Sequence, residues 1–176
     1  MYNKKQNDAK KDNANNVKKN MLESQVISIG RVTKVTKGGR HFRFAATVVV
    51  GNRKGLVGIG TGKSNEVQEA IRKAELAANK NVIRIALIDN RTIPHEATAK
   101  VGRAVVLLKP AKEGYGIVAG GAARAILELA GVKDIVAKSL GSNTKLNVAK
   151  ATLDALQMQK SPARVAALRG KKVEEL

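Results

Sequence analysis

The sequence predicts a mixed α and β fold made of two successive units, and three observations support this prediction. The first half holds three β-rich runs separated by glycine turns and followed by one run with helical spacing. The second half alternates short apolar β-type runs with helical runs. Hydrophobic residues make up 43% of the 176 residues, which is enough for one core or two small ones. A chain that is disordered throughout is therefore excluded.

The first unit is predicted to have the order βββα. Val26–Thr36 is rich in β-formers, and Gly30 within it suits a bulge. A turn follows at residues 37–40, and the next strands are predicted over Phe42–Val50 and Leu56–Ile59. A helix comes next, because apolar residues recur at helical spacing: Val67, Ala70, Ile71, Ala74, Ala77 and Ala78.

The start of this helix carries a capping pattern. Ser64 or Asn65 can accept hydrogen bonds from the first helical amides, and Gln68 stands three residues after Asn65, as in a capping box. The sequence therefore predicts a side-chain cap at Ser64 or Asn65.

The second unit follows with no obvious linker. Val82–Ile88 and Arg103–Lys109 are apolar β-type runs, Thr92–Thr98 is a weaker candidate, and residues 110–120 form a glycine-rich loop. A short strand is predicted over Ile135–Ala137. This order is compatible with an α+β or an α/β fold, the latter with parallel strands.

Two further helices are predicted beside these strands, and a third after them. One contains Ala123, Ile126, Leu127 and Ala130 and can end at Gly131, and the other contains Leu146, Ala149, Leu153 and Leu156. Ser161 followed by Pro162 is typical of a helix start, which predicts a helical tail over residues 161–176.

The predicted domain organisation has four parts. Residues 1–21 form a basic arm with no periodicity, which we expect to be disordered, and residues 22–84 form the first domain. Residues 85–160 form the second domain, and the helical tail completes the chain.

The charge of the chain indicates a polyanionic partner. The sequence has 33 Lys and Arg against 14 Asp and Glu, a formal net charge of +19, and most of the excess lies beyond residue 20. The densest basic clusters lie in turns rather than along one helix face, which favours nucleic acid over a membrane surface. No cysteine, secretory signal or apolar run of membrane-spanning length is present, so we expect a cytoplasmic protein.

The sequence offers little for catalysis. His41 and His95, the only histidines, lie in different predicted units without carboxylates at ligand spacing, so neither a metal site nor a cofactor is expected. The run from Gly58 to Ser64 resembles a phosphate loop, but Val57 stands where a Walker A loop has its first glycine. A weaker interpretation remains open, in which glycines at the helix start bind an RNA phosphate through their amides.

The turn after the first predicted strand is the best candidate for RNA binding. Cations recur every three residues at Arg31, Lys34, Lys37 and Arg40, and Gly38 and Gly39 let a phosphate backbone approach closely. The alternative is a solvated hairpin tip. Four more cations in the same unit favour RNA contact, at turns or strand ends: Arg43, Arg53, Lys54 and Lys63.

Aromatic residues are too few for base stacking to be the main binding mode. The chain has two Phe and two Tyr, and we expect Phe42 and Phe44 to pack in the core. Recognition is then expected to be of RNA shape and phosphates.

Several ordered runs resemble a known family. The segments are 39–46, 49–52, 55–60 and 62–63 in the first half, and 108–111, 116–122, 127–132 and 137–142 in the second. Together they are similar to protein five of the bacterial small ribosomal subunit, over about Glu23 to Glu175. The resemblance implies an α+β fold with a double-stranded-RNA-binding-like N-terminal domain and a βαβ-type C-terminal domain.

The resemblance also implies a function and partners. The protein is expected to be a non-catalytic structural constituent that binds small-subunit ribosomal RNA through both domains and takes no small-molecule substrate. Its hairpin, with Val32, Thr33 and Lys34, is expected to be the segment that the family associates with the antibiotic spectinomycin. Ribosomal protein four is expected to contact the second domain and influence decoding accuracy, at Gly114, Tyr115, Gly116, Gly120, Gly121 and Arg124.

Further partners follow from the same resemblance. The C-terminal part is expected to approach ribosomal protein eight, and basic residues near the messenger entry pore are expected to help unwind messenger RNA. Two other functions remain open: a free RNA-binding or RNA-annealing factor, and a nucleotide-binding enzyme that uses residues 60–64.

Overall fold

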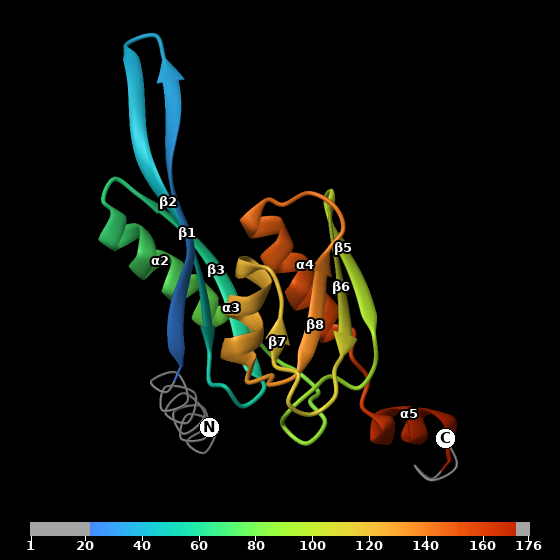
Figure 1. Cartoon of the computed structure of the whole chain (residues 1–176). Coiled ribbons are helices and arrows are strands. Elements are labelled where there is room, and N and C mark those ends of the chain that lie inside the picture. The colour runs from blue at the N-terminus through green and yellow to red at the C-terminus, as the bar shows by residue number, and fades with distance from the viewer. Residues whose placement is uncertain (1–21, 172–176) are drawn as a thin grey trace, which may run out of the picture.

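In the computed structural model, which describes residues 22–171, the chain forms two four-stranded sheets flanked by helices (Figure 1). The first sheet has the order β1-β2-β3-β4, and every neighbouring pair is antiparallel. Its strands are β1 (Glu23–Thr36), β2 (Gly39–Gly51), β3 (Leu56–Ser64) and β4 (Val82–Arg84). The helix α2 (Val67–Lys80) covers one face of this sheet.

The second sheet has the order β5-β6-β8-β7. Only β7 and β8 are parallel, so the fold is α+β rather than α/β. The strands are β5 (Ala97–Val101), β6 (Ala104–Pro110), β7 (Ile117–Val118) and β8 (Ile135–Ser139). Two helices accompany it, α3 (Gly121–Ala130) and α4 (Lys145–Gln157), and α5 (Pro162–Arg169) follows.

Glycines allow α2 to pack unusually close to β3. Gly58, Gly60 and Gly62 alternate along the strand and therefore share one face, opposite the buried alanines of α2. A Cβ atom on Gly58 would lie 2.6 Å from the carbonyl oxygen of Ala78, and one on Gly60 would overlap the backbone of Ala74. These glycines serve helix–sheet packing.

This packing corrects two predictions. The third strand was expected to end at Ile59, but it continues to Ser64, so its glycines belong to a strand and not to a helix N-terminus. The side-chain cap predicted at Ser64 or Asn65 is also wrong. The N-cap residue is Glu66, which makes no side-chain cap bond. The Ser64 hydroxyl does not cap the helix but donates to the carboxylate of Glu69.

Two other predictions are corrected by the pairing of the strands. The bulge of β1 lies between Val26 and Ser28, while Gly30 keeps regular register with Ala45. The run Val82–Ile88 forms a strand only over β4, and that strand completes the first sheet by pairing with β3. The weak candidate Thr92–Thr98 contributes only the start of β5.

Two helix ends that local signals predict are confirmed. Gly131 adopts the left-handed conformation with φ 86° after α3. Ser161 accepts a hydrogen bond from the amide of Arg164, and Pro162 opens α5.

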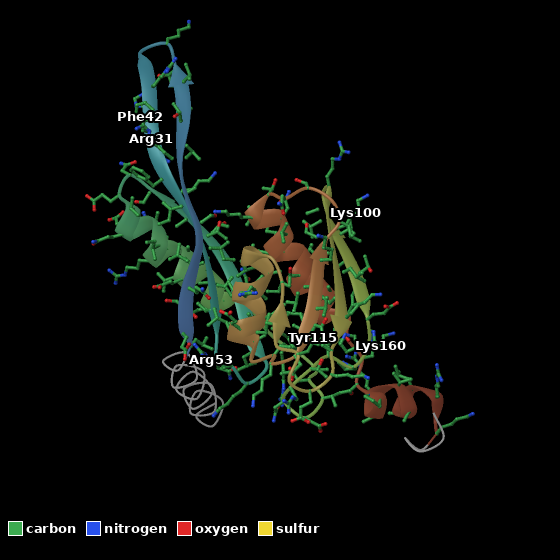
Figure 2. All side chains as sticks on the ribbon, in the orientation of Figure 1. Arg31, Phe42, Arg53, Lys100, Tyr115 and Lys160 are labelled. Atoms are coloured by element: carbon green, nitrogen blue, oxygen red, sulfur yellow. The ribbon has the colours of Figure 1, made fainter. Side chains whose placement is uncertain are left out.

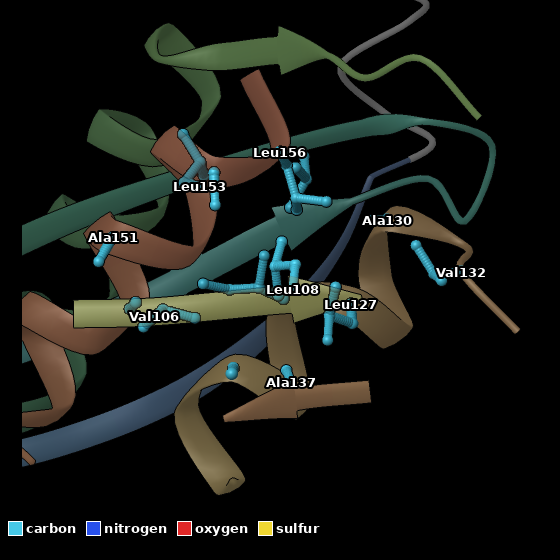
Figure 3. Packing of buried hydrophobic residues seen from close by; sticks show 14 of the residues in the cluster. Val106, Leu108, Leu127, Ala130, Val132, Ala137, Ala151, Leu153 and Leu156 are labelled. Atoms are coloured by element: carbon cyan, nitrogen blue, oxygen red, sulfur yellow. The ribbon is translucent and has the colours of Figure 1, made fainter. Parts of the chain in front are cut away.

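The two sheets share one hydrophobic core. Val49 and Val57 of the first sheet belong to the same buried cluster as Leu108 of β6, Leu127 of α3 and Leu156 of α4. Figure 3 shows Leu108, Leu127 and Leu156 packed together. The turn at residues 52–55 also reaches the end of α3, where the amides of Arg53 and Gly55 donate to the carbonyls of Leu129 and Ala130 at 2.9 Å each. The predicted boundary between residues 84 and 85 stays a prediction.

Candidate nucleic-acid interface

The hairpin formed by β1 and β2 projects beyond the rest of the fold (Figure 1). Its strands remain paired to the tip, where Thr36 lies opposite Gly39 and its hydroxyl donates to the Gly39 carbonyl at 3.2 Å. Gly39 has φ 137°, a value that favours glycine. A Cβ on Gly38 or Gly39 would meet no atom within 4 Å, so the backbone of the tip is open to a ligand.

Cations line both faces of this hairpin. Residues that lie opposite each other in an antiparallel pair point to the same face. Arg31, Phe42 and Arg40 therefore point to the α2 side, which Phe44 and Ala46 also face. The other face carries further cations and one histidine, at Lys34, His41, Arg43 and, from β3, Lys63.

A groove of about 870 Å³ runs along the hairpin. We call it the basic groove, and its lining residues are Val32, Thr33, Lys34, Thr36, Arg40, His41, Phe42, Arg43, Lys63 and Asn65. Four of them are cations and none is a carboxylate. A groove with this charge attracts a phosphate backbone, and its binding energy depends on salt.

Phe42 does not pack in the core, which corrects the prediction made for it. Its side chain is 45% exposed, and the guanidinium carbon of Arg31 lies 3.7 Å from the centre of its ring. This distance is that of a cation–π contact. Phe44 does pack, half-buried, against the cluster of Ala46, Val48 and the α2 alanines, as predicted.

The lysine and serine that resemble a phosphate loop point to opposite faces of β3. Lys63 lies opposite Ala45 and lines the basic groove, whereas Ser64 is 8% exposed and donates to Glu69 at 2.5 Å. Lys73 also contacts Glu69, at 3.2 Å. The hydrogen bond from Ser64, followed by that from Lys73, lowers the pKa of Glu69 below its usual value. The Ser64 hydroxyl is therefore occupied by Glu69 and is not free to bind a phosphate beside Lys63.

Arg53 and Lys54 lie at the other end of the first sheet. Thirteen residues of β2 separate this turn from the hairpin tip, or about 40 Å at the usual rise of a strand. The side chain of Arg53 pairs with Glu23 at 2.8 Å (Figure 2). Of the ten predicted RNA-binding residues, the structure gathers eight on and beside the hairpin and places these two apart.

The predicted protein-interface residues form one region in the second unit. Gly114 and Gly116 have φ 83° and 76°, and Tyr115 between them is 64% exposed (Figure 2). Gly120 and Gly121 begin α3, and the guanidinium of Arg124 donates to the carbonyl of Ile117 at 3.1 Å. A glycine-rich loop and a helix start thus lie side by side, with one tyrosine standing out.

A buried aspartate that the sequence analysis missed anchors this loop. Asp134 is 2% exposed, accepts from the amide of Gly116 at 2.8 Å and from Nε of Arg91 at 2.5 Å. The guanidinium of Arg91 also contacts Glu113. The pKa of Asp134 is held below its ordinary value mainly by the hydrogen bond from Arg91. The same hydrogen bond raises the pKa of Arg91. No local pattern marks these residues, because Arg91 and Asp134 are 43 positions apart.

The two histidines lie far apart in the fold. His41 lines the basic groove, and Nε2 of His95 accepts from the amide of Lys160 at 3.2 Å. Within residues 22–171, no group of three His, Cys, Asp or Glu could hold a metal ion. No helix in that range is long and apolar enough to cross a membrane.

Two family models match the chain. The model described as "Ribosomal protein S5, N-terminal domain" matches residues 22–86, and "Ribosomal protein S5, C-terminal domain" matches residues 99–169. The chain belongs to the ribosomal protein S5 family. Proteins of this family are RNA-binding structural components of the small ribosomal subunit that act in translation, and the two matched domains agree with the two-unit α+β fold.

Proposed function

We propose that this S5-family protein binds small-subunit ribosomal RNA through the basic groove and the open hairpin tip. The observation that supports this most is the composition of the groove, whose lining holds four cations and no carboxylate. Such a surface binds phosphates from a curved backbone and carries little base-specific information. The scarcity of aromatic residues agrees with recognition that depends mainly on shape and phosphate.

The loop around Tyr115 is the proposed contact with ribosomal protein four. Tyrosine is enriched at protein interfaces because it combines a large apolar surface with a polar end. The hydrogen bonds of Asp134 with the amide of Gly116 and with Arg91 hold this loop in one conformation before binding, which lowers the entropic cost of docking. Through this contact we propose an influence on decoding accuracy.

Other parts of the proposal concern the ends of the fold. The helix α5 and the residues beyond it are proposed to approach ribosomal protein eight. Exposed cations are proposed to contact messenger RNA at its entry pore. The protein is proposed to act without catalysis, cofactor or metal, and its place on the ribosome is proposed to be cytoplasmic.

Two variants with an equal reduction of charge test the groove. Lys37→Gln with Arg40→Gln removes two cations from the hairpin tip, and we expect weaker binding to ribosomal RNA fragments at every sequence tested. The slope of log affinity against log salt should become shallower by about one unit for each phosphate that the variant no longer binds. Lys80→Gln with Arg84→Gln is the matched control, because both residues lie far from the tip.

Equal slopes of log affinity against log salt for both variants would mean that the hairpin tip does not contact RNA. Sedimentation of a cell extract at moderate salt distinguishes the proposed ribosomal role from the alternative of a free RNA-binding or RNA-annealing factor. We expect the protein to travel with the small subunit, and a protein found entirely in the free pool would favour that alternative.

A further inference from the structure

Among the described residues, Phe42 belongs to neither hydrophobic cluster, and its one cation–π partner is Arg31. The guanidinium lies 3.7 Å from the ring centre, and both residues lie midway along the projecting hairpin (Figure 2). Leaving such a ring 45% exposed forgoes much of the free energy that burial of an aromatic side chain provides. The exposed part of the ring gains nothing from folding and is available to a ligand.

The uncovered part of the ring borders the basic groove. Phe42 is one of the lining residues of the groove, whereas Arg31 is not, so Arg31 covers a side of the ring that the groove leaves free. Arg40 lines the same groove and points to the same hairpin face as Phe42, and Lys34 lines the groove from the other face. A flat apolar surface thus lies in a groove whose cations can bind phosphates next to a stacked nucleotide.

We propose that Phe42, backed by Arg31, stacks on an unpaired nucleobase of the RNA whose phosphates the basic groove binds. This inference rests on the proposed RNA-binding function. It adds that the RNA must present an unpaired base at the groove, because a base that stacks on the protein has left the continuous stack of a double helix. Base–aromatic stacking tolerates any base, because every base has a π face. Arg31 orients the ring through the cation–π contact and lowers the entropic cost of stacking.

The chemistry separates this site from the phosphate contacts around it. Stacking is not ionic, so it contributes affinity that is independent of counterion release. Removing the ring should weaken binding without changing the salt slope, whereas removing a cation changes both.

The first experiment uses fluorescence. The chain contains no tryptophan, so Phe42→Trp introduces a single reporter in the full-length protein, and its far-ultraviolet circular dichroism checks the fold. The probes are an RNA hairpin with an unpaired loop, a fully paired RNA duplex of equal length, and inorganic polyphosphate. We expect strong quenching with the looped RNA and little with the duplex or polyphosphate. Equal quenching by polyphosphate, or by the duplex, would overturn the proposal.

The second experiment uses affinity. Phe42→Leu should weaken binding of the looped RNA about 5- to 100-fold at unchanged salt slope. Val35→Ala is the matched control, because Val35 is exposed on the same hairpin face, and its affinity should equal that of the unmodified protein. Arg31→Lys keeps the charge but replaces the planar guanidinium, and we expect an intermediate reduction in affinity.

The two proposals fail in different ways. If Phe42→Leu binds looped RNA as tightly as the unmodified protein while the Lys37 and Arg40 variant is weakened, stacking is refuted and the phosphate groove stands. If a peptide or protein quenches Phe42→Trp and looped RNA does not, the ring serves a protein contact and the stacking proposal is wrong. If the unmodified protein binds no structured RNA at physiological salt, the proposed function itself fails.

Discussion

At the scale of single residues, Asp134 shows how one buried charge fixes a loop. Its carboxylate joins the amide of Gly116 to the guanidinium of Arg91, and Arg91 extends the contact to Glu113. A carboxylate buried this deeply is tolerated only when such donors replace water. The loop that carries Tyr115 is thus held at two points by one side-chain network.

The stability that this aspartate contributes should depend on pH. Its pKa is lowered in the folded protein, so its contribution is present above the pKa of an unfolded aspartate, about 3.9, and is lost as pH falls through the folded value. Asp134→Asn removes the charge at every pH. We expect the urea midpoint of this variant to lie below that of the unmodified protein at pH 6 to 8, by a constant amount.

The same difference should shrink below about pH 4, because the unfolded aspartate then takes up a proton while the folded carboxylate, whose pKa is lower, is still charged. Urea unfolding followed by circular dichroism from pH 2 to 8 measures it. Glu96→Gln is the control, since Glu96 is exposed and makes only a surface ion pair with Lys109. A difference between Asp134→Asn and the unmodified protein that stays constant down to pH 2 would contradict this account.

The residues that sequence reasoning placed correctly carry local signals. Gly131 and the pair Ser161 and Pro162 act on the backbone within one helical turn, so their roles can be predicted from spacing alone. Arg91 lies 43 positions from Asp134 in the chain, and Phe42 meets Arg31 only through the pairing of β1 with β2. Whether an aromatic ring is buried or exposed depends on how far a hairpin extends past its covering helix, and no local pattern gives that length.

At the scale of elements, the contact of β3 with α2 depends on small residues on both sides. Gly58, Gly60 and Gly62 face helix residues that include the fully buried Ala70, Ala74 and Ala78. From the sequence alone, part of this glycine pattern resembles a loop, because glycines are common in turns and are depleted in strands. The strand is nevertheless maintained, because its pairing with β2 continues to Ser64.

Gly60→Ala tests this interpretation. The added Cβ would overlap backbone atoms of Ala74 and Ala78, which cannot rotate away as a side chain could. We expect the unfolding free energy to fall by at least about 1–3 kcal/mol, measured by urea unfolding. Gly30→Ala, also within a strand, is the matched control: no atom lies within 4 Å of its added Cβ, so we expect no destabilisation.

Equal destabilisation of the two alanine variants would mean that the glycines matter only through backbone conformation. A phosphate-loop role would give a different result again, because Gly60→Ala would then change nucleotide binding rather than stability.

At the scale of the whole molecule, the two family domains are joined by backbone as well as by side chains. The turn at residues 52–55 donates two amides to the carbonyls at the end of α3, which satisfies groups that a helix end leaves unpaired. Val49 and Val57 continue the same core on the other side of this contact. The sequence patterns identified each unit but could not predict this joint, because the hydrogen bonds run between backbone groups 75 or more positions apart.

A shared core and a shared helix end predict that the two units unfold together. In the unmodified protein, amide hydrogens of β2 and of α4 should exchange through the same global opening, with equal free energies within error.

Gly131→Ala tests the contact between the two units, because Gly131 has φ 86° and a Cβ there would overlap the backbone of Arg53. We expect the exchange free energies of both β2 and α4 to fall in this variant. The two free energies should also become unequal, because the contact that couples the units is displaced. Gly170→Ala has a similarly positive φ of 63° with open space around it, so it controls for backbone strain alone and should leave β2 and α4 equal. Different free energies for β2 and α4 already in the unmodified protein would mean that the proposed RNA-binding hairpin and the Tyr115 loop belong to units that move independently.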